Sequence, residues 1–110
     1  MSDEAVLLDV LTHGRRAIRA AKQKDAFLRD EIAQSAVAYC ISVMGEAVKR
    51  LSPEFQRRHP EVNWSDIAKM RDLLVHAYHR VDWNIVCDTM TTSIPETLRP
   101  IEEFIPPKGE

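Results

Sequence analysis

The segment from Arg71 to Arg80 concentrates side chains that can carry out proton-transfer or phosphate chemistry. Arg71, His76, Tyr78 and His79 fall within ten residues. Histidine titrates near neutral pH and can act as an acid or a base. Arginine stays charged and presents a planar fork that fits a phosphate. These residue types favour a site that moves a proton or holds a phosphate.

The spacing of these residues limits how they can work together. Arg71 and His76 are five residues apart, which on a helix places them about 140° from each other around the axis. Either the helix ends near His76 and the chain turns, or the two groups meet through a second copy of the chain. Asp72 precedes His76 by four residues, so its carboxylate is predicted to touch the imidazole and hold its charged form.

A purely structural interpretation of the same residues stays open. Arg71 falls on an apolar stripe and needs a partner there, such as an ion pair with Glu46. His76 and Tyr78 could simply end a helix. His76 and His79 have the spacing H-x-x-H, but no carboxylate or cysteine stands at matching helical spacing, so no metal site is expected.

The elements that must position this segment are predicted to be helices. Apolar residues recur with helical period, and Pro53, Asn63 and Asp82 mark helix starts. Pro95 and Pro100 are expected to kink or interrupt the last helix. The predicted helices cover 3–22, 26–51, a short stretch at 53–59, 64 to at least 76, and 83–105. A short connection is expected between the first two.

These helices predict an all-α fold, an antiparallel four-helix bundle with a short extra helix. The chain of 110 residues suits a single domain, 1–110, with 105–110 as a frayed tail. In the second helix Val37, Ile41, Met44, Val48 and Leu51 repeat at intervals of four and three residues. That pattern is typical of a helix packed lengthwise on a neighbour.

Composition narrows the function classes. Residues 1–80 carry 13 Lys and Arg against 11 Asp and Glu, and residues 81–110 carry 2 against 6, so a nucleic-acid surface would have to be a local patch. Cys40 and Cys87 stand far apart and are expected to be reduced, buried thiols. No apolar stretch is long enough to span a bilayer, and a cytoplasmic location is expected.

The stretch "RDLLVHAY" fits R-x-x-x-x-H-x-Y, and in that respect the chain resembles HEPN-domain ribonucleases, specifically HepT-like toxins. Asp72 stands where those proteins carry a polar residue after the arginine. The likeness extends to "DEAVLLDVLTHGRRA", "VMGEAVKRLSPEFQRRHPEVNW" and "RVDWNIVCDTMTTSIPETL". The chain differs from many such proteins at Tyr39 and Cys40, where they often carry polar residues.

The resemblance implies a HEPN-like fold and a metal-independent endoribonuclease that needs no cofactor. Arg71 and His76 would be catalytic, Asp72 supporting, and Glu46 and His79 cleft or ion-pair residues. The enzyme would be a homodimeric toxin of a type VII toxin–antitoxin pair. Its antitoxin, an MntA-like nucleotidyltransferase, would transfer AMP to Tyr78. Two other functions stay open: a HEPN module that binds RNA, nucleotide or the transferase without cleaving, and a purely structural bundle.

Overall fold

The computed structural model describes residues 2–105, and of Tyr78 only the backbone. This part of the chain is almost entirely helical and contains no strand, which confirms the all-α class. The α-helices are α1 (Asp3–Ala21), α2 (Lys24–Leu28), α3 (Glu31–Arg50), α4 (Pro53–Arg58), α5 (Trp64–Ala77), α6 (Trp83–Asp88) and α7 (Ile94–Phe104). A 3₁₀ turn, η1 (Tyr78–Arg80), follows α5, and a π turn, η2 (Thr89–Ser93), joins α6 to α7. None of these helices is long and apolar enough to cross a membrane.

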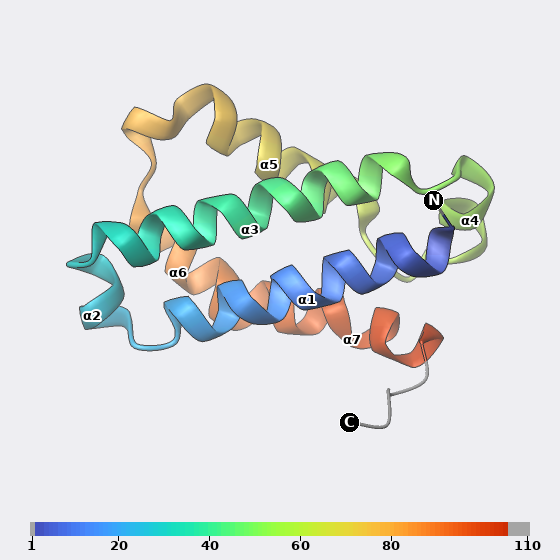
Figure 1. Ribbon diagram of the computed structural model, residues 1–110, viewed down its shortest axis with the longest axis horizontal. Coiled ribbons are helices and arrows are strands. Elements are labelled where there is room, and N and C mark those ends of the chain that lie inside the picture. Colours follow the sequence, from blue (N-terminus) through green and yellow to red (C-terminus); the bar gives the residue numbers. More distant parts are fainter. Residues whose placement is uncertain (1, 106–110) are drawn as a thin grey trace.

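The two longest helices, α1 and α3, lie antiparallel and side by side at the centre of the bundle (Figure 1). On one side α7 packs against α1, and on the other side α5 packs chiefly against α3. The residues predicted to form the seam of α3 are all buried: Val37, Ile41, Met44, Val48 and Leu51. Because α5 packs chiefly on one neighbour, much of its opposite face stays open to solvent.

The prediction of one helix over 26–51 is wrong at its start, because α2 ends at Leu28 and Asp30 caps the start of α3. Its Oδ1 accepts hydrogen bonds from the backbone N–H groups of Ile32 and Ala33 at 3.0 and 3.1 Å. An aspartate that satisfies these otherwise unpaired groups fixes the first turn of α3 at Glu31. The preceding residues form the separate short helix α2, so the predicted connection before residue 26 is confined to two residues, 22–23.

The two prolines of the last predicted helix have different effects. Pro95 stands in the first turn of α7, where its missing N–H costs little, and η2 precedes it. Pro100 lies inside α7, which continues through it because the buried side chains of Leu98 and Ile101 hold that face on the bundle. The predicted interruption is therefore confirmed before Pro95, whereas α7 is not interrupted at Pro100. Ile105, predicted as part of a frayed tail, is buried, and 106–110 lie outside the described residues.

The start of α5 is fixed by several hydrogen bonds. The side-chain oxygen of Asn63 accepts from the backbone N–H of Asp66 at 3.2 Å, and its amide donates to the Asp66 carboxylate at 2.8 Å. The indole of Trp64 donates to the carbonyl of His59 at 3.0 Å. The prediction of Asn63 as the N-cap is confirmed. Since a helix is a rigid rod over this length, these bonds also set the rotation of every later α5 residue.

Candidate active site

Arg71 lies where α5 packs closely against α3, at Gly45. A Cβ built on Gly45 of α3 would overlap the Cβ of Arg71 and lie 2.8 Å from its Cγ. A residue larger than glycine would therefore push the two helices apart at this point. The Arg71 side chain retains 27% of its surface exposed, and its Nε is buried with no hydrogen-bond partner in the described part of the chain. The side chain is thus held by packing along its stem.

Two carboxylates hold the end of the Arg71 side chain. Its Nη2 lies 3.6 Å from Oε1 of Glu46 on α3, which confirms the predicted ion pair. Its Nη1 donates to Oδ1 of Asp72 at 3.2 Å. Because each terminal nitrogen faces a different carboxylate, the plane of the guanidinium is oriented before any phosphate arrives.

Asp72 links the two helices at this site. The same oxygen, Oδ1, also accepts a hydrogen bond from Nζ of Lys49 on α3 at 2.9 Å. The bond from Lys49, and after it the bond from Arg71, holds the pKa of Asp72 below its ordinary value. The sequence-based prediction of the site did not include Lys49 or Gly45. A usable signal was present, since the two are one helical turn apart beside the buried seam of α3.

His76 lies on the exposed side of α5, in a shallow hollow of about 290 Å³. The hollow is lined by Lys69, Asp72, Leu73, His76 and Ala77. The prediction that the Asp72 carboxylate contacts the imidazole is wrong for the residues that the structure describes. The hydrogen bonds of that carboxylate go to Lys49 and Arg71 instead, because hydrogen bonds from charged donors to a carboxylate are the strong ones.

Within one chain, Arg71 and His76 point in different directions. Arg71 is directed at α3 beside Gly45, whereas His76 lies in the hollow on the open side of α5. Asp72 borders both places, since it bonds Arg71 and also lines the hollow. The structure thus brings Arg71, Asp72 and Glu46 together, and it places His76 on the neighbouring, exposed surface of α5.

Tyr78, the last residue of the motif, and His79 follow directly after α5. The α-helix ends at Ala77, and Tyr78 and His79 belong to the 3₁₀ turn η1. This confirms that the helix ends close to His76. The side chain of Tyr78 lies outside the described residues, and His79 is exposed. Among residues 2–105, no group of three or more His, Cys, Asp and Glu side chains is arranged to hold a metal ion.

The two positions that differ from many similar proteins lie away from the contact between α3 and α5. Cys40 is buried in the core, where desolvation raises the pKa of its thiol. Tyr39 is 63% exposed and its ring meets that of His13 on α1 edge-on, with centroids 6.0 Å apart. Among the described residues, neither is hydrogen-bonded or ion-paired to Arg71.

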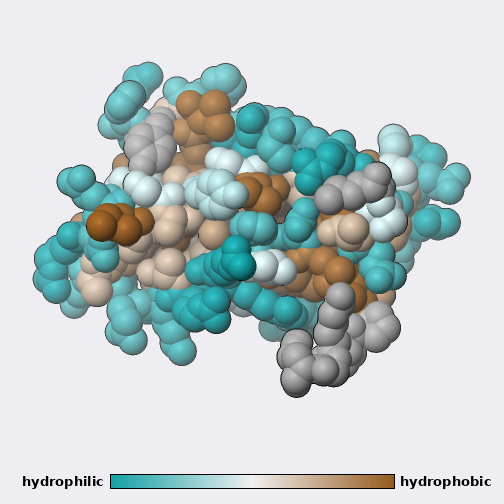
Figure 2. All heavy atoms as spheres, in the orientation of Figure 1, coloured by the Kyte–Doolittle hydropathy of each residue, from teal (hydrophilic) through white to brown (hydrophobic). Residues whose placement is uncertain are grey.

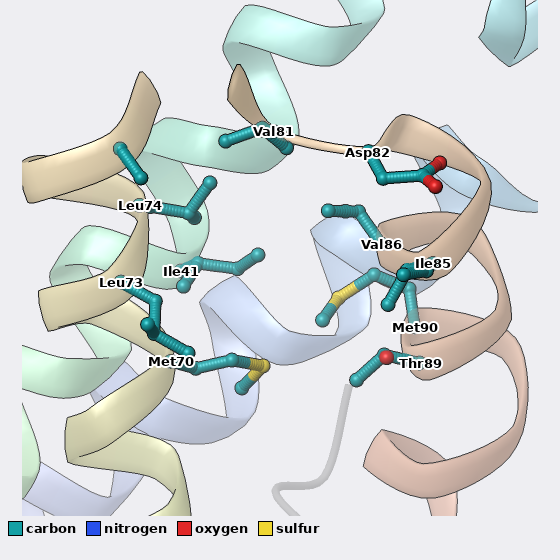
Figure 3. A pocket seen from close by; sticks show the side chains of 11 residues that line it. Ile41, Met70, Leu73, Leu74, Val81, Asp82, Ile85, Val86, Thr89 and Met90 are labelled. Carbon is teal, nitrogen blue, oxygen red and sulfur yellow. The ribbon is translucent and has the colours of Figure 1, made fainter. Parts of the chain in front are cut away.

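An apolar groove runs beside the hollow, between α5 and α6 (Figure 3). It has a volume of about 280 Å³. In Figure 3, Met70, Leu73 and Leu74 of α5 form one wall and face Val86 and Met90 across the opening. Leu73 lines both the groove and the hollow with His76, and 69% of it is exposed. Figure 2 shows a hydrophobic patch over the C-terminal half of α5, the segment that contains this side chain.

Comparison with known proteins places the chain in a family. Residues 7–104 match a family model described as ribonuclease HepT-like. The protein named "Putative RNase MJ0127" from Methanocaldococcus jannaschii is 35% identical over 103 residues, which cover 92% of this chain and 85% of that protein. "Putative RNase TTE0752" from Caldanaerobacter subterraneus is 37% identical over 79 residues, 72% of this chain and 70% of its own.

A third relative has the name of the family itself. "Probable ribonuclease HepT" from Thermococcus cleftensis is 42% identical over 69 residues, which cover 63% of each chain. No solved structure matches the sequence significantly. The family match runs from α1 into the last turn of α7 and includes the whole segment from Arg71 to Arg80. The chain therefore belongs to the HepT-like ribonuclease family.

Proposed function

We propose that this protein is a metal-independent endoribonuclease and the toxin of a type VII toxin–antitoxin pair. The observation that carries the proposal is Arg71, oriented by Glu46 and Asp72, five residues before an exposed His76 on the same helix. This pairing of a fixed cation with a titratable group lies in a chain of a ribonuclease family. An arginine kept only for stability would gain little from an arrangement that leaves its Nε unpaired.

The proposed reaction uses the nucleophile that RNA already carries. His76 takes the proton of the 2′-hydroxyl as its oxygen attacks phosphorus, and the bond from phosphorus to the 5′-oxygen breaks. The leaving oxygen receives a proton from an acid, and Arg71 stabilises the extra negative charge on the phosphate oxygens. The products are a 2′,3′-cyclic phosphate and a 5′-hydroxyl end. No step requires a metal ion, since imidazole and guanidinium supply the proton transfer and the charge.

A homodimer would bring Arg71 of one chain to His76 of the other. One chain offers a single His76 at the site, and that side chain points away from the contact that holds Arg71. A two-fold axis beside α5 would place two motifs across one cleft, so that Arg71 of one subunit works with His76 of the other. Leu73 and Val75, both large, apolar and exposed, lie on α5 within three residues of His76 and offer the surface that such a partner would cover.

Tyr78 is the proposed point of control. An MntA-like nucleotidyltransferase antitoxin would transfer AMP from ATP to its phenol, releasing pyrophosphate and the phenolic proton. Tyr78 stands two residues after His76 in the turn that follows α5. An attached AMP adds bulk and a negative charge beside the site, so it would compete with the RNA phosphate for Arg71.

The direct test is to incubate the purified full-length chain with a defined RNA in the presence of EDTA. The proposal predicts cleavage that EDTA does not inhibit, with cyclic phosphate ends identified by mass spectrometry. The matched control is the same oligonucleotide with 2′-deoxy sugars, which must stay intact because it lacks the nucleophile. Binding of RNA without cleavage would instead support the non-catalytic binding module.

A further inference from the structure

One face of α5 carries a second charged group in line with His76. Lys69 precedes His76 by seven residues, which is two helical turns, so both side chains project from the same side of the helix. Asp72 and Leu73 stand between them, and all four line the same shallow hollow. This side is the open one, since α5 packs chiefly on α3 with its other face.

The charges around the site differ in how far they are compensated. Arg71 and Lys49 carry two positive charges, which Glu46 and Asp72 balance at 2.9 to 3.6 Å. Lys69 is exposed, and its ammonium has no ion-pair partner in the described part of the chain. The positive field over the hollow therefore comes from Lys69 and, when protonated, from His76.

We propose that Lys69 binds an RNA phosphate next to the one that is cleaved, an inference that rests on the proposed ribonuclease function. On an α-helix the Cα atoms of residues seven apart are separated by about 10 Å along the axis. A phosphate seated at His76 therefore lies about two helical turns from the backbone of Lys69. In the arrangement that we propose, the flexible stem of Lys69 extends along α5 and its ammonium contacts the adjoining phosphate of the same strand. This contact positions the strand along α5 and is independent of base sequence.

The size of the effect follows from counterion release. Each phosphate neutralised on a single strand contributes about 0.7 to the slope of log affinity against log salt concentration. Removing one such contact should weaken binding about fivefold at 0.1 M salt and lower the slope by about 0.7. The catalytic rate constant should change little, because Lys69 does not touch the reacting phosphate in this arrangement.

The experiment measures binding and cleavage on separate substrates. A labelled, fully 2′-O-methylated oligoribonucleotide, which cannot be cut, is titrated with the full-length protein at several salt concentrations. The variants are Lys69→Gln, Lys69→Arg and a control, Lys22→Gln, which removes another exposed lysine directly after α1. We expect the weaker binding and lower slope for Lys69→Gln only, with Lys69→Arg close to the unaltered protein. Cleavage of unmodified RNA by each protein is measured in parallel.

The outcomes separate this inference from the proposed function. Unchanged affinity and slope in Lys69→Gln, or an equal loss in Lys22→Gln, overturns the role of Lys69 while cleavage by the unaltered protein still supports the ribonuclease. Binding that depends on Lys69 without any cleavage keeps the phosphate contact and overturns the catalytic proposal. A protein that neither binds the methylated strand nor cleaves RNA overturns both.

Discussion

Replacing Gly45 with alanine tests whether the tight contact between α3 and α5 sets the position of Arg71. The new Cβ would overlap the Cβ of Arg71 and lie 2.8 Å from its Cγ. Carbon atoms in favourable contact are about 3.5–4.0 Å apart, so the helices must separate by roughly 1 Å. Since both clashing atoms belong to the inner stem of Arg71, rotation of a flexible end cannot relieve the overlap.

The expected cost to stability is modest, because two effects oppose each other. Overpacking typically costs about 1–3 kcal/mol. Alanine in a helix interior is about 1 kcal/mol more favourable than glycine. The net loss of about 0–2 kcal/mol corresponds to a fall in Tm of up to about 8 °C for a chain of this size. Gly45→Ala should therefore stay folded at 20 °C, as circular dichroism would show.

The expected cost to activity is much larger than the cost to stability. A displacement of about 1 Å in a positioning group can lower a rate about 10²-fold. We therefore expect the single-turnover rate of RNA cleavage by Gly45→Ala to fall by about two orders of magnitude at 20 °C.

Gly14 provides the matched control for this substitution. A Cβ there would lie 2.6 Å from Cδ1 of Leu98, at the end of a side chain that can rotate away, and on α1 rather than at the site. Gly14→Ala should keep cleavage within a few-fold of the unaltered rate. A folded Gly45→Ala protein that cleaves RNA at the normal rate would refute the role assigned to this contact.

Three further predictions concern Asp72, the dimer and Tyr78. The pKa of Asp72 is lowered in the folded protein from an ordinary value of 3.8, so its stabilising effect is present above that pH and is lost as pH falls through the folded-state pKa. Asp72→Asn should therefore lower Tm at pH 7, and this difference should shrink as pH falls below 3.8; a difference that stays the same down to acid pH would contradict this. Mixing Arg71→Ala chains with His76→Ala chains should restore about a quarter of normal cleavage. Half of the dimers would then be mixed, and each mixed dimer would hold one intact site out of two. No recovery of cleavage would argue against a shared site. Incubation with the cognate nucleotidyltransferase, ATP and Mg²⁺ should add AMP by intact mass and stop cleavage, but leave Tyr78→Phe unmodified; modification at Tyr39 would disprove the assignment.

Much of the fold was predictable because it follows from local rules. The period of the buried residues located the long helices, and Asn63 and Asp82 marked helix starts as capping residues should. The division at Asp30 was missed because a helical apolar pattern runs across it, and only the competing cap decides the boundary. Continuity through Pro100 was missed because tertiary packing, which a local pattern does not contain, outweighs the lost hydrogen bond.

The candidate site was predictable in its residue types but not in its contacts. Glu46 was the natural carboxylate for an arginine on a buried stripe, and the structure pairs them. The true partners of Asp72 depend on how α3 and α5 are rotated against each other, which helical spacing within α5 does not specify. The bond from Lys49 to Asp72 forms where α5 lies close to α3 beside Gly45.

The roles of Arg71 and His76 in RNA cleavage can be tested by the single-turnover rate of His76→Ala on one defined RNA. Loss of an acid–base group typically lowers a rate about 10²–10⁴-fold. We expect a loss of that size, with an unchanged helical circular dichroism signal because His76 is exposed and outside the core. A folded His76→Ala protein that cleaves the RNA as fast as the unaltered chain would show that His76 is not catalytic.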